Sequence, residues 1–213
     1  MLPNLILGLS LAGLMHASIV TYSTPASGPA LPDNNAAGVT FDLVITDNFQ
    51  ISGGNALTLD LFNWSHTWIG DLLITLEKVG ETGPVVVFDR PWVPASGSAG
   101  TDCDFNPNAV YRFSSDAATV LPQGFCGDNV MVAAGTYRAT LADDATASLL
   151  SSAFGGLSTQ GVWRLTVADL ANGDLQPAGW GYALNFNAVP EPSMVLPLAG
   201  ALAAALAARR RAA

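Results

Sequence analysis

Apolar and polar residues alternate in several short segments of the chain, the period of an extended strand with one face in a core. The clearest case is residues 72–76, where Leu72, Ile74 and Leu76 alternate with Leu73 and Thr75. The same period predicts strands at residues 38–47, 56–64, 85–88, 110–113, 136–141, 161–169 and 180–186. Residues 145–154 are predicted to form the one helix. On these strands we expect the inward faces to include Leu57, Leu59, Leu61, Trp163, Leu165 and Val167.

Turn residues separate these segments. The chain of 213 residues contains 21 Gly and 13 Pro, and Gly70-Asp71 bends the chain just before the strand at 72–76. Eight short strands with long connections are typical of an all-β domain. We therefore predict a jelly-roll-like β-sandwich of about eight strands that spans residues 31–188.

Both ends of the chain are apolar. Residues 2–20 form an apolar run that is short for a membrane-spanning helix. A run of this length is typical of the core of a signal peptide, and we predict cleavage near Ala17 or Ala26. A buried N-terminal helix is the alternative. Residues 22–32, rich in Ser, Thr, Pro, Ala and Gly, are predicted to form a linker. Residues 1–26 are thus assigned to a signal peptide and linker.

The C-terminal segment, residues 189–213, has three parts. The motif Val189-Pro190-Glu191-Pro192 precedes an apolar run at 194–208 and the cluster Arg209, Arg210 and Arg211. This order resembles a PEP-CTERM sorting tail, which implies recognition by an exosortase. A short transmembrane helix with its arginines in the cytoplasm would leave the domain outside. An Ala-rich helix packed on the domain is the alternative.

The motif His66-Thr-x-x-Gly70-Asp71-Leu72-x-Ile-x-Leu resembles the P domain (P/Homo B domain) that follows the subtilisin-like catalytic domain of proprotein convertases. The resemblance extends to residues 31–34, 88–91, 113–117, 149–156, 161–169 and 179–186. It implies a non-catalytic β-sandwich in which His66, Gly70 and Asp71 have structural roles. Subtilisin-like catalysis needs Ser, His and Asp. The chain has two histidines: His16 lies in the predicted signal peptide, and His66 lies in the motif of a non-catalytic domain. We therefore expect no triad and predict no enzymatic activity.

Charge narrows the possible ligands. The net charge is −9, and residues 27–190 alone carry sixteen acidic and five basic residues, a net charge of −11. Such a surface repels nucleic acid and anionic lipid. Acidic loops can bind calcium through carboxylate oxygens. The candidate ligands are Asp71, Asp89, Asp102, Asp104 and Asp116, with solvated loop acids and turn caps as the alternative.

Cys103 and Cys126 lie in one irregular region. If the chain is exported, we expect them to form a disulfide that stabilises the fold by about 3 kcal/mol. A metal site is the alternative, although two thiols without a nearby His do not complete a zinc shell.

These observations favour a protein exported by a Gram-negative bacterium. It would be held transiently in the inner membrane, processed by an exosortase and delivered to the cell surface or extracellular matrix. One alternative is an accessory domain that binds a subtilisin-like protease in trans. Another is a calcium-dependent carbohydrate-binding module that would contact extracellular polysaccharide through exposed Trp64, Trp68 and Trp92. Packing of these tryptophans in the core or in loops is the favoured interpretation.

Overall fold

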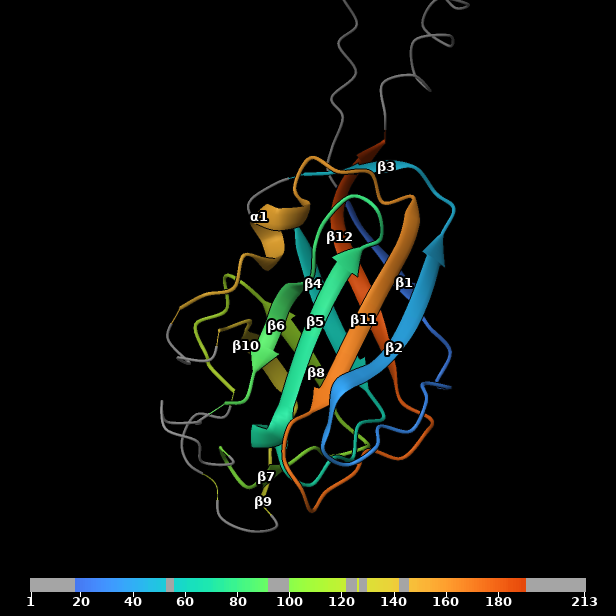
Figure 1. Cartoon of the computed structure of the whole chain (residues 1–213). Helices are drawn as coiled ribbons and strands as arrows, with labels where there is room; N and C mark the ends of the chain where they lie inside the picture. Colours follow the sequence, from blue (N-terminus) through green and yellow to red (C-terminus); the bar gives the residue numbers. More distant parts are fainter. Residues whose placement is uncertain are drawn as a thin grey trace, which may run out of the picture.

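The computed structural model describes residues 18–52, 56–91, 100–121, 126, 130–141 and 146–190 (Figure 1). These residues form short strands, a 3₁₀ turn at Ile69–Asp71 and a short helix, α1 (Leu150–Phe154). The strands are β1 (Ser18–Ser23), β2 (Asn35–Ile45), β3 (Phe49–Ile51), β4 (Leu57–Phe62), β5 (Leu72–Lys78), β6 (Val85–Asp89), β7 (Cys103–Asp104), β8 (Val110–Ser114), β9 (Val130–Met131), β10 (Gly135–Arg138), β11 (Gly161–Asp169) and β12 (Gly181–Pro190).

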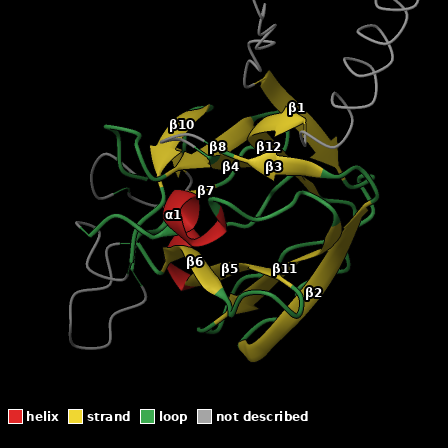
Figure 2. Cartoon of the chain, turned by 90° about the horizontal axis from the view of Figure 1, so that it is seen from above, coloured by secondary structure: helices red, strands yellow, loops and turns green. Residues whose placement is uncertain are grey.

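The strands form two facing sheets. One has the order β1-β12-β4-β8-β10, with β3 also paired to β12, and the other has the order β2-β11-β5-β6. Figure 2 shows the sheets as two layers with α1 between their margins, where the helix contacts β4 of one sheet and β6 of the other. Strands β7 and β9 form a small parallel pair of their own. The predicted all-β sandwich is confirmed.

The core lies between the two sheets and comes from the alternation of residues along each strand. Leu57, Leu59 and Leu61 of β4 are fully buried, as are Trp163, Leu165 and Val167 of β11 and Leu72, Ile74 and Leu76 of β5. The predicted inward faces are therefore confirmed. Tyr182 of β12 links the layers, because its hydroxyl donates to the Trp163 carbonyl at 2.8 Å. Burial of apolar surface at this scale is the main favourable term in folding.

The first and last described strands are neighbours. β1 runs antiparallel to β12, with Ser18 opposite Ala188. Val189 and Pro190 continue β12 and pair with Gln50 and Phe49 of β3. The chain therefore enters and leaves the described sandwich at the same end, as Figure 1 shows.

The structure differs from the sequence prediction mainly at short elements. β1 lies within residues 1–26, which the sequence analysis assigned to a signal peptide and linker, and β3, β7 and β9 have only two or three residues each. α1 begins at Leu150, so the described helix is shorter than the predicted one. Among the residues described, no helix has the length and apolar character needed to cross a bilayer. The predicted membrane helix at 194–208 lies outside them, as do Glu191, Pro192 and Arg209–Arg211.

Candidate functional site: a buried motif and a polar trough

His66 lies inside the protein at the start of the motif that precedes β5. Its imidazole is fully buried, and the Trp68 backbone N–H donates to Nδ1 at 3.2 Å. The ring proton therefore lies on Nε2, which is 3.3 Å from Asp169 Oδ2. Burial lowers the pKa of His66, although the Asp169 carboxylate opposes this effect. The imidazole is a neutral hydrogen-bonding group that ties the motif to the end of β11.

Gly70 lies where a second loop crosses the motif. Its N–H donates to the Thr101 carbonyl at 3.1 Å. A Cβ atom at Gly100, which has a φ of +72°, would lie 2.7 Å from the Gly70 Cα. Only glycine allows both this backbone angle and this close approach. Gly70 of the motif therefore helps to hold the loop at residues 100–105.

Asp71 is the one motif residue with a strongly perturbed acidity. Its side chain is buried, and Oδ1 has no hydrogen-bond partner among the described residues. Burial, followed by the negative charges of Asp169 and Asp174, raises its pKa from the ordinary 3.8 to about 7, while Arg90 acts in the opposite direction. A carboxyl group in such surroundings favours its protonated form.

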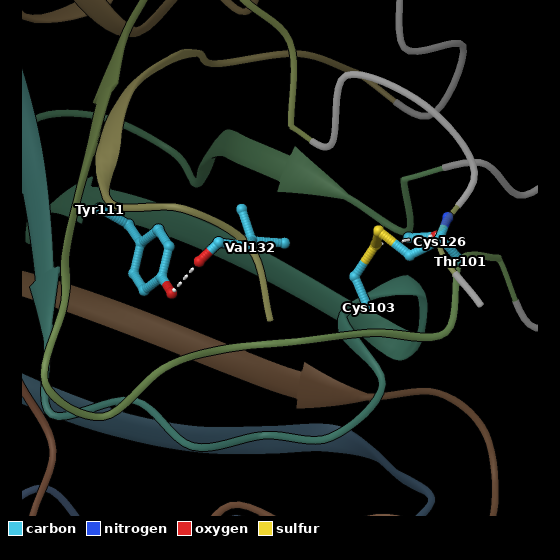
Figure 3. Close-up of a disulfide and its surroundings, with 5 residues drawn as sticks. All are labelled: Thr101, Cys103, Tyr111, Cys126 and Val132. Atoms are coloured by element: carbon cyan, nitrogen blue, oxygen red, sulfur yellow. Dashed lines mark hydrogen bonds between the residues drawn. A yellow bond between two sulfur atoms is a disulfide. The ribbon is translucent and has the colours of Figure 1, made fainter. Parts of the chain in front are cut away.

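The two cysteines join beside this motif. Cys103 and Cys126 form a disulfide with their Cα atoms 5.1 Å apart, which fits the expected bond (Figure 3). The Thr101 hydroxyl lies 3.1 Å from Cys103 Sγ and accepts the Cys126 N–H at 3.1 Å. Nearby, the Tyr111 hydroxyl donates to the Val132 carbonyl at 2.9 Å. This end of the sandwich is therefore cross-linked by both covalent and hydrogen bonds.

The predicted calcium ligands do not gather into one group. Asp71 is buried near His66, Asp104 is buried in β7, and Asp116 lines a trough on the six-stranded sheet. Within the described ranges, no three or more His, Cys, Asp or Glu side chains are placed to hold a metal ion.

Trp64 belongs to the core, as the favoured interpretation of the tryptophans expected, and not to an aromatic binding surface. Its side chain is fully buried, packs 4.7 Å from the ring of Trp180 and donates from Nε1 to the Gly181 carbonyl at 3.3 Å. Trp68 is partly buried. Trp92 lies outside the described residues. β4 ends at Phe62, and the chain turns inward at Trp64.

A polar trough runs over the outer face of the six-stranded sheet. It has a volume of about 620 Å³, within the range of ligand sites. Its lining residues come from β1, β4, β8, β10, β12 and the turn after β8: Ile19, Thr21, Thr58, Arg112, Ser114, Asp116, Ala117, Thr136, Asn185, Phe186 and Asn187. Sequence analysis did not single out this set.

One row of the trough crosses three strands in register. Thr21 lies opposite Asn185, which lies opposite Thr58. The Thr21 hydroxyl donates to Asn185 Oδ1 at 2.7 Å, and Asn185 Nδ2 donates to Thr58 Oγ1 at 3.2 Å. Asn185 and Thr58 are each only 9% exposed, although both face away from the core. The outer face is therefore hollowed at its centre.

A second row lies two residues along β4. Asp60 pairs in register with Arg112, which pairs in register with Thr136. Arg112 Nε and Nη2 each donate to one carboxylate oxygen of Asp60 at 2.7 Å. This bidentate geometry fixes the guanidinium plane and neutralises its charge. The Asp60 side chain is 12% exposed, whereas that of Arg112 is 45% exposed and reaches toward solvent.

Comparisons with known proteins show a likeness to solved structures. The serine protease of Aeromonas sobria, in a crystal structure with the chaperone ORF2, matches with a TM-score of 0.41 and 18% identity, over 81% of this chain and 28% of that one. A second structure of the Aeromonas sobria serine protease matches with a TM-score of 0.40 and 18% identity, over 82% and 27%. The chain spans little more than a quarter of their length. No protein-family model matches it. No curated protein matches either.

Proposed function

We propose that this chain is an exported, non-catalytic β-sandwich module related to P domains, which acts as a binding or structural component at the bacterial surface. The observation that carries the proposal is the motif His66–Leu76, whose histidine is wholly internal and hydrogen-bonded at both ring nitrogens. Such an imidazole cannot reach a substrate, so the motif supports a fold rather than a reaction.

The position of the chain ends supports the export part of the proposal. Ser18 and Ala188 are paired, so the apolar segments before β1 and after β12 are attached to the sandwich at one end. One membrane surface could hold both segments without distorting the domain. Exosortase recognition at Pro190-Glu191-Pro192, transient residence in the inner membrane and release to the surface or matrix remain proposals that rest on the sequence resemblance.

The experiment is a deletion of residues 191–213 in a Gram-negative host that has an exosortase. The deletion should start after Pro190, because Val189 and Pro190 belong to β12 and pair with β3. We expect the shortened chain to fold but to be lost from the cell surface. A matched variant, Arg209→Ser with Arg210→Ser and Arg211→Ser, keeps the length and tests the cytoplasmic stop. Unchanged surface delivery of the shortened chain would overturn the sorting proposal.

A second candidate function is an accessory that binds a subtilisin-like protease in trans. The resemblance of residues 66–76 to the convertase P-domain motif favours it, because those domains pack on a protease domain. Affinity purification of the full chain from its own exporting cell, followed by mass spectrometry, tests this alternative. Recovery of an exported serine protease in a stoichiometric amount supports this alternative. Purification of the chain without any such protease contradicts it.

A further inference from the structure

The geometry points to the polar trough as a binding site for a neutral, hydroxyl-rich glycan chain. This inference rests on the proposed function, since it names the ligand class of a surface binding module. The trough differs from the tryptophan surface considered above, because its lining combines hydroxyl, amide and guanidinium groups with the apolar residues Ile19, Ala117 and Phe186.

The trough has unused hydrogen-bonding capacity. Arg112 uses two of its five N–H groups on Asp60, which leaves three for a ligand as far as the described residues show. Thr58 Oγ1 accepts from Asn185, and its own hydroxyl proton has no hydrogen-bond acceptor among the described residues. Asn185 likewise retains its second amide hydrogen. Donors and hydroxyls in one surface suit ligands that offer many hydroxyl and ring oxygens.

The network also holds these groups in place before a ligand arrives. Thr21, Asn185 and Thr58 form a continuous hydrogen-bonded row, and the bidentate pair fixes Arg112 beside it. Side chains that are already ordered lose little conformational freedom on binding. This arrangement favours a defined site over a loosely solvated sheet face.

The dimensions fit a chain rather than a single small molecule. The trough crosses five adjacent strands, β1, β12, β4, β8 and β10. Four strand spacings correspond to about 19 Å. Its rims, at Thr21 and Thr136, are exposed, whereas the centre at Asn185 and Thr58 is nearly buried. A polymer could therefore lie across the sheet and continue beyond both edges.

Charge selects the class of ligand. The guanidinium of Arg112 is neutralised by Asp60, and Asp116 adds a negative charge to the lining. Anionic polymers gain little from such a surface and are repelled by the acidic remainder of the protein. The apolar segments at residues 2–14 and 194–208 are equally unsuited, since they would bury the hydroxyls and amides without hydrogen bonds. A neutral glycan satisfies these groups.

The test uses the full chain on an array of immobilised neutral and uronic-acid oligosaccharides, followed by calorimetry with the best neutral binder. Arg112→Met removes the guanidinium, and Thr58→Val removes one hydroxyl with little change of shape. The matched control is Arg164→Met on the other sheet, where Arg164 makes a similar bidentate pair with Asp42. Thermal unfolding of each variant verifies that it is folded.

We expect binding to a neutral oligosaccharide that is weakened about tenfold by Arg112→Met and about threefold to tenfold by Thr58→Val. Arg164→Met should bind like the original chain. Failure of the folded chain to bind any neutral glycan, preference for uronic acids, or equal binding by all variants would overturn the inference. Absent glycan binding by a full chain that reaches the surface normally would refute the glycan site alone, whereas failure of the full chain to reach the surface would refute the proposed function.

Discussion

The outer faces of the two sheets carry the same kind of ion pair in different surroundings. Arg112 and Asp60 face each other in register on the six-stranded sheet, as Arg164 and Asp42 do on the four-stranded sheet. Both pairs are bidentate. Next to the Arg112 pair on the same face, Thr58 and Ser114 are 9% and 3% exposed, whereas Val44, on the same face as Asp42, is 67% exposed. An ion pair therefore marks a candidate site only where the sheet around it is hollowed.

The same contrast exists within one strand. Leu59 and Thr58 are neighbours on β4, but Leu59 faces the core and Thr58 faces the trough. Both have low exposure, so exposure alone does not distinguish a packing residue from a ligand-facing one. Substitutions that separate stability from binding make the distinction.

The largest predicted effect comes from the core side of this strand. Leu59→Ala should lower the free energy of unfolding by about 2–5 kcal/mol, because it leaves a cavity between the sheets. Thr58→Val should change it by about 1 kcal/mol or less. Urea denaturation of both variants measures the difference. Equal losses would mean that Thr58 is a packing residue and that the two faces of β4 are not distinct.

The disulfide provides a control that lies outside both outer faces. Cys103→Ser combined with Cys126→Ala should lower the free energy of unfolding by about 3 kcal/mol, since the bond closes a loop with a sequence separation of 23. Denaturation under non-reducing conditions gives this value. Glycan binding by the folded variant should be retained, and its selective loss would show that the trough depends on the disulfide end of the domain.

Asp71 makes the stability of the fold depend on pH. Its carboxyl has a folded-state pKa of about 7, so between pH about 4 and 7 the unfolded chain releases a proton that the folded chain retains. Stability from this group is present at low pH and is lost as pH rises to 7. The full shift corresponds to about 4 kcal/mol, and after allowance for solvent screening we expect Asp71→Asn to stabilise the fold by about 2 kcal/mol at pH 8 and by much less at pH 4.

The pH dependence of Asp71 must be measured by comparing variants, because His66 also changes stability with pH. Burial lowers its pKa, so its contribution to stability is lost as pH falls below its ordinary value. The two groups thus act in opposite directions in the original chain. Only the difference between Asp71→Asn and the original chain, measured at each pH by denaturation, isolates Asp71. A difference that does not depend on pH would contradict the raised pKa.

The smallest effect compares the two ion pairs directly. Arg112→Met should lower stability by about 1 kcal/mol after allowance for solvent screening, because it leaves the largely enclosed Asp60 carboxylate unpaired. Arg164→Met, on the open face, should lower it less. Thermal unfolding at low and high salt measures both. A larger loss of stability for Arg164→Met than for Arg112→Met would mean that the Arg164–Asp42 pair, and not the Arg112–Asp60 pair, is the enclosed one.

Sequence analysis predicted the long strands well, because alternating residues report directly which side faces the core. Trp163, Leu165 and Val167 are fully buried on this principle. Strands of two or three residues, such as β7 and β9, contain too little alternation to be recognised. β1 was not predicted because Ser18–Ser23 adjoins an apolar run and is defined by its pairing with β12, more than 150 residues away.

The trough could not be predicted for a related reason. Thr58, Arg112 and Asn185 are ordinary outward-facing positions when each strand is considered alone, and the polar positions of β11 show the same pattern. Their meeting depends on strand order and register, which bring β1, β12, β4 and β8 together. Trp64 shows a related difficulty, because aromatic character alone does not distinguish an exposed binding residue from a core residue, and the structure places it in the core.

The most direct test of the account is the intact mass of the protein recovered from its native surface or medium, without reduction. For an exported and sorted module with an oxidised cysteine pair, we predict a chain that retains β1 and β12, lacks the apolar tail, and is lighter by two hydrogens than the reduced form. A chain that retains Arg209–Ala213 would contradict removal of the tail, and one that starts after Ser23 would contradict the assignment of β1 to the mature domain.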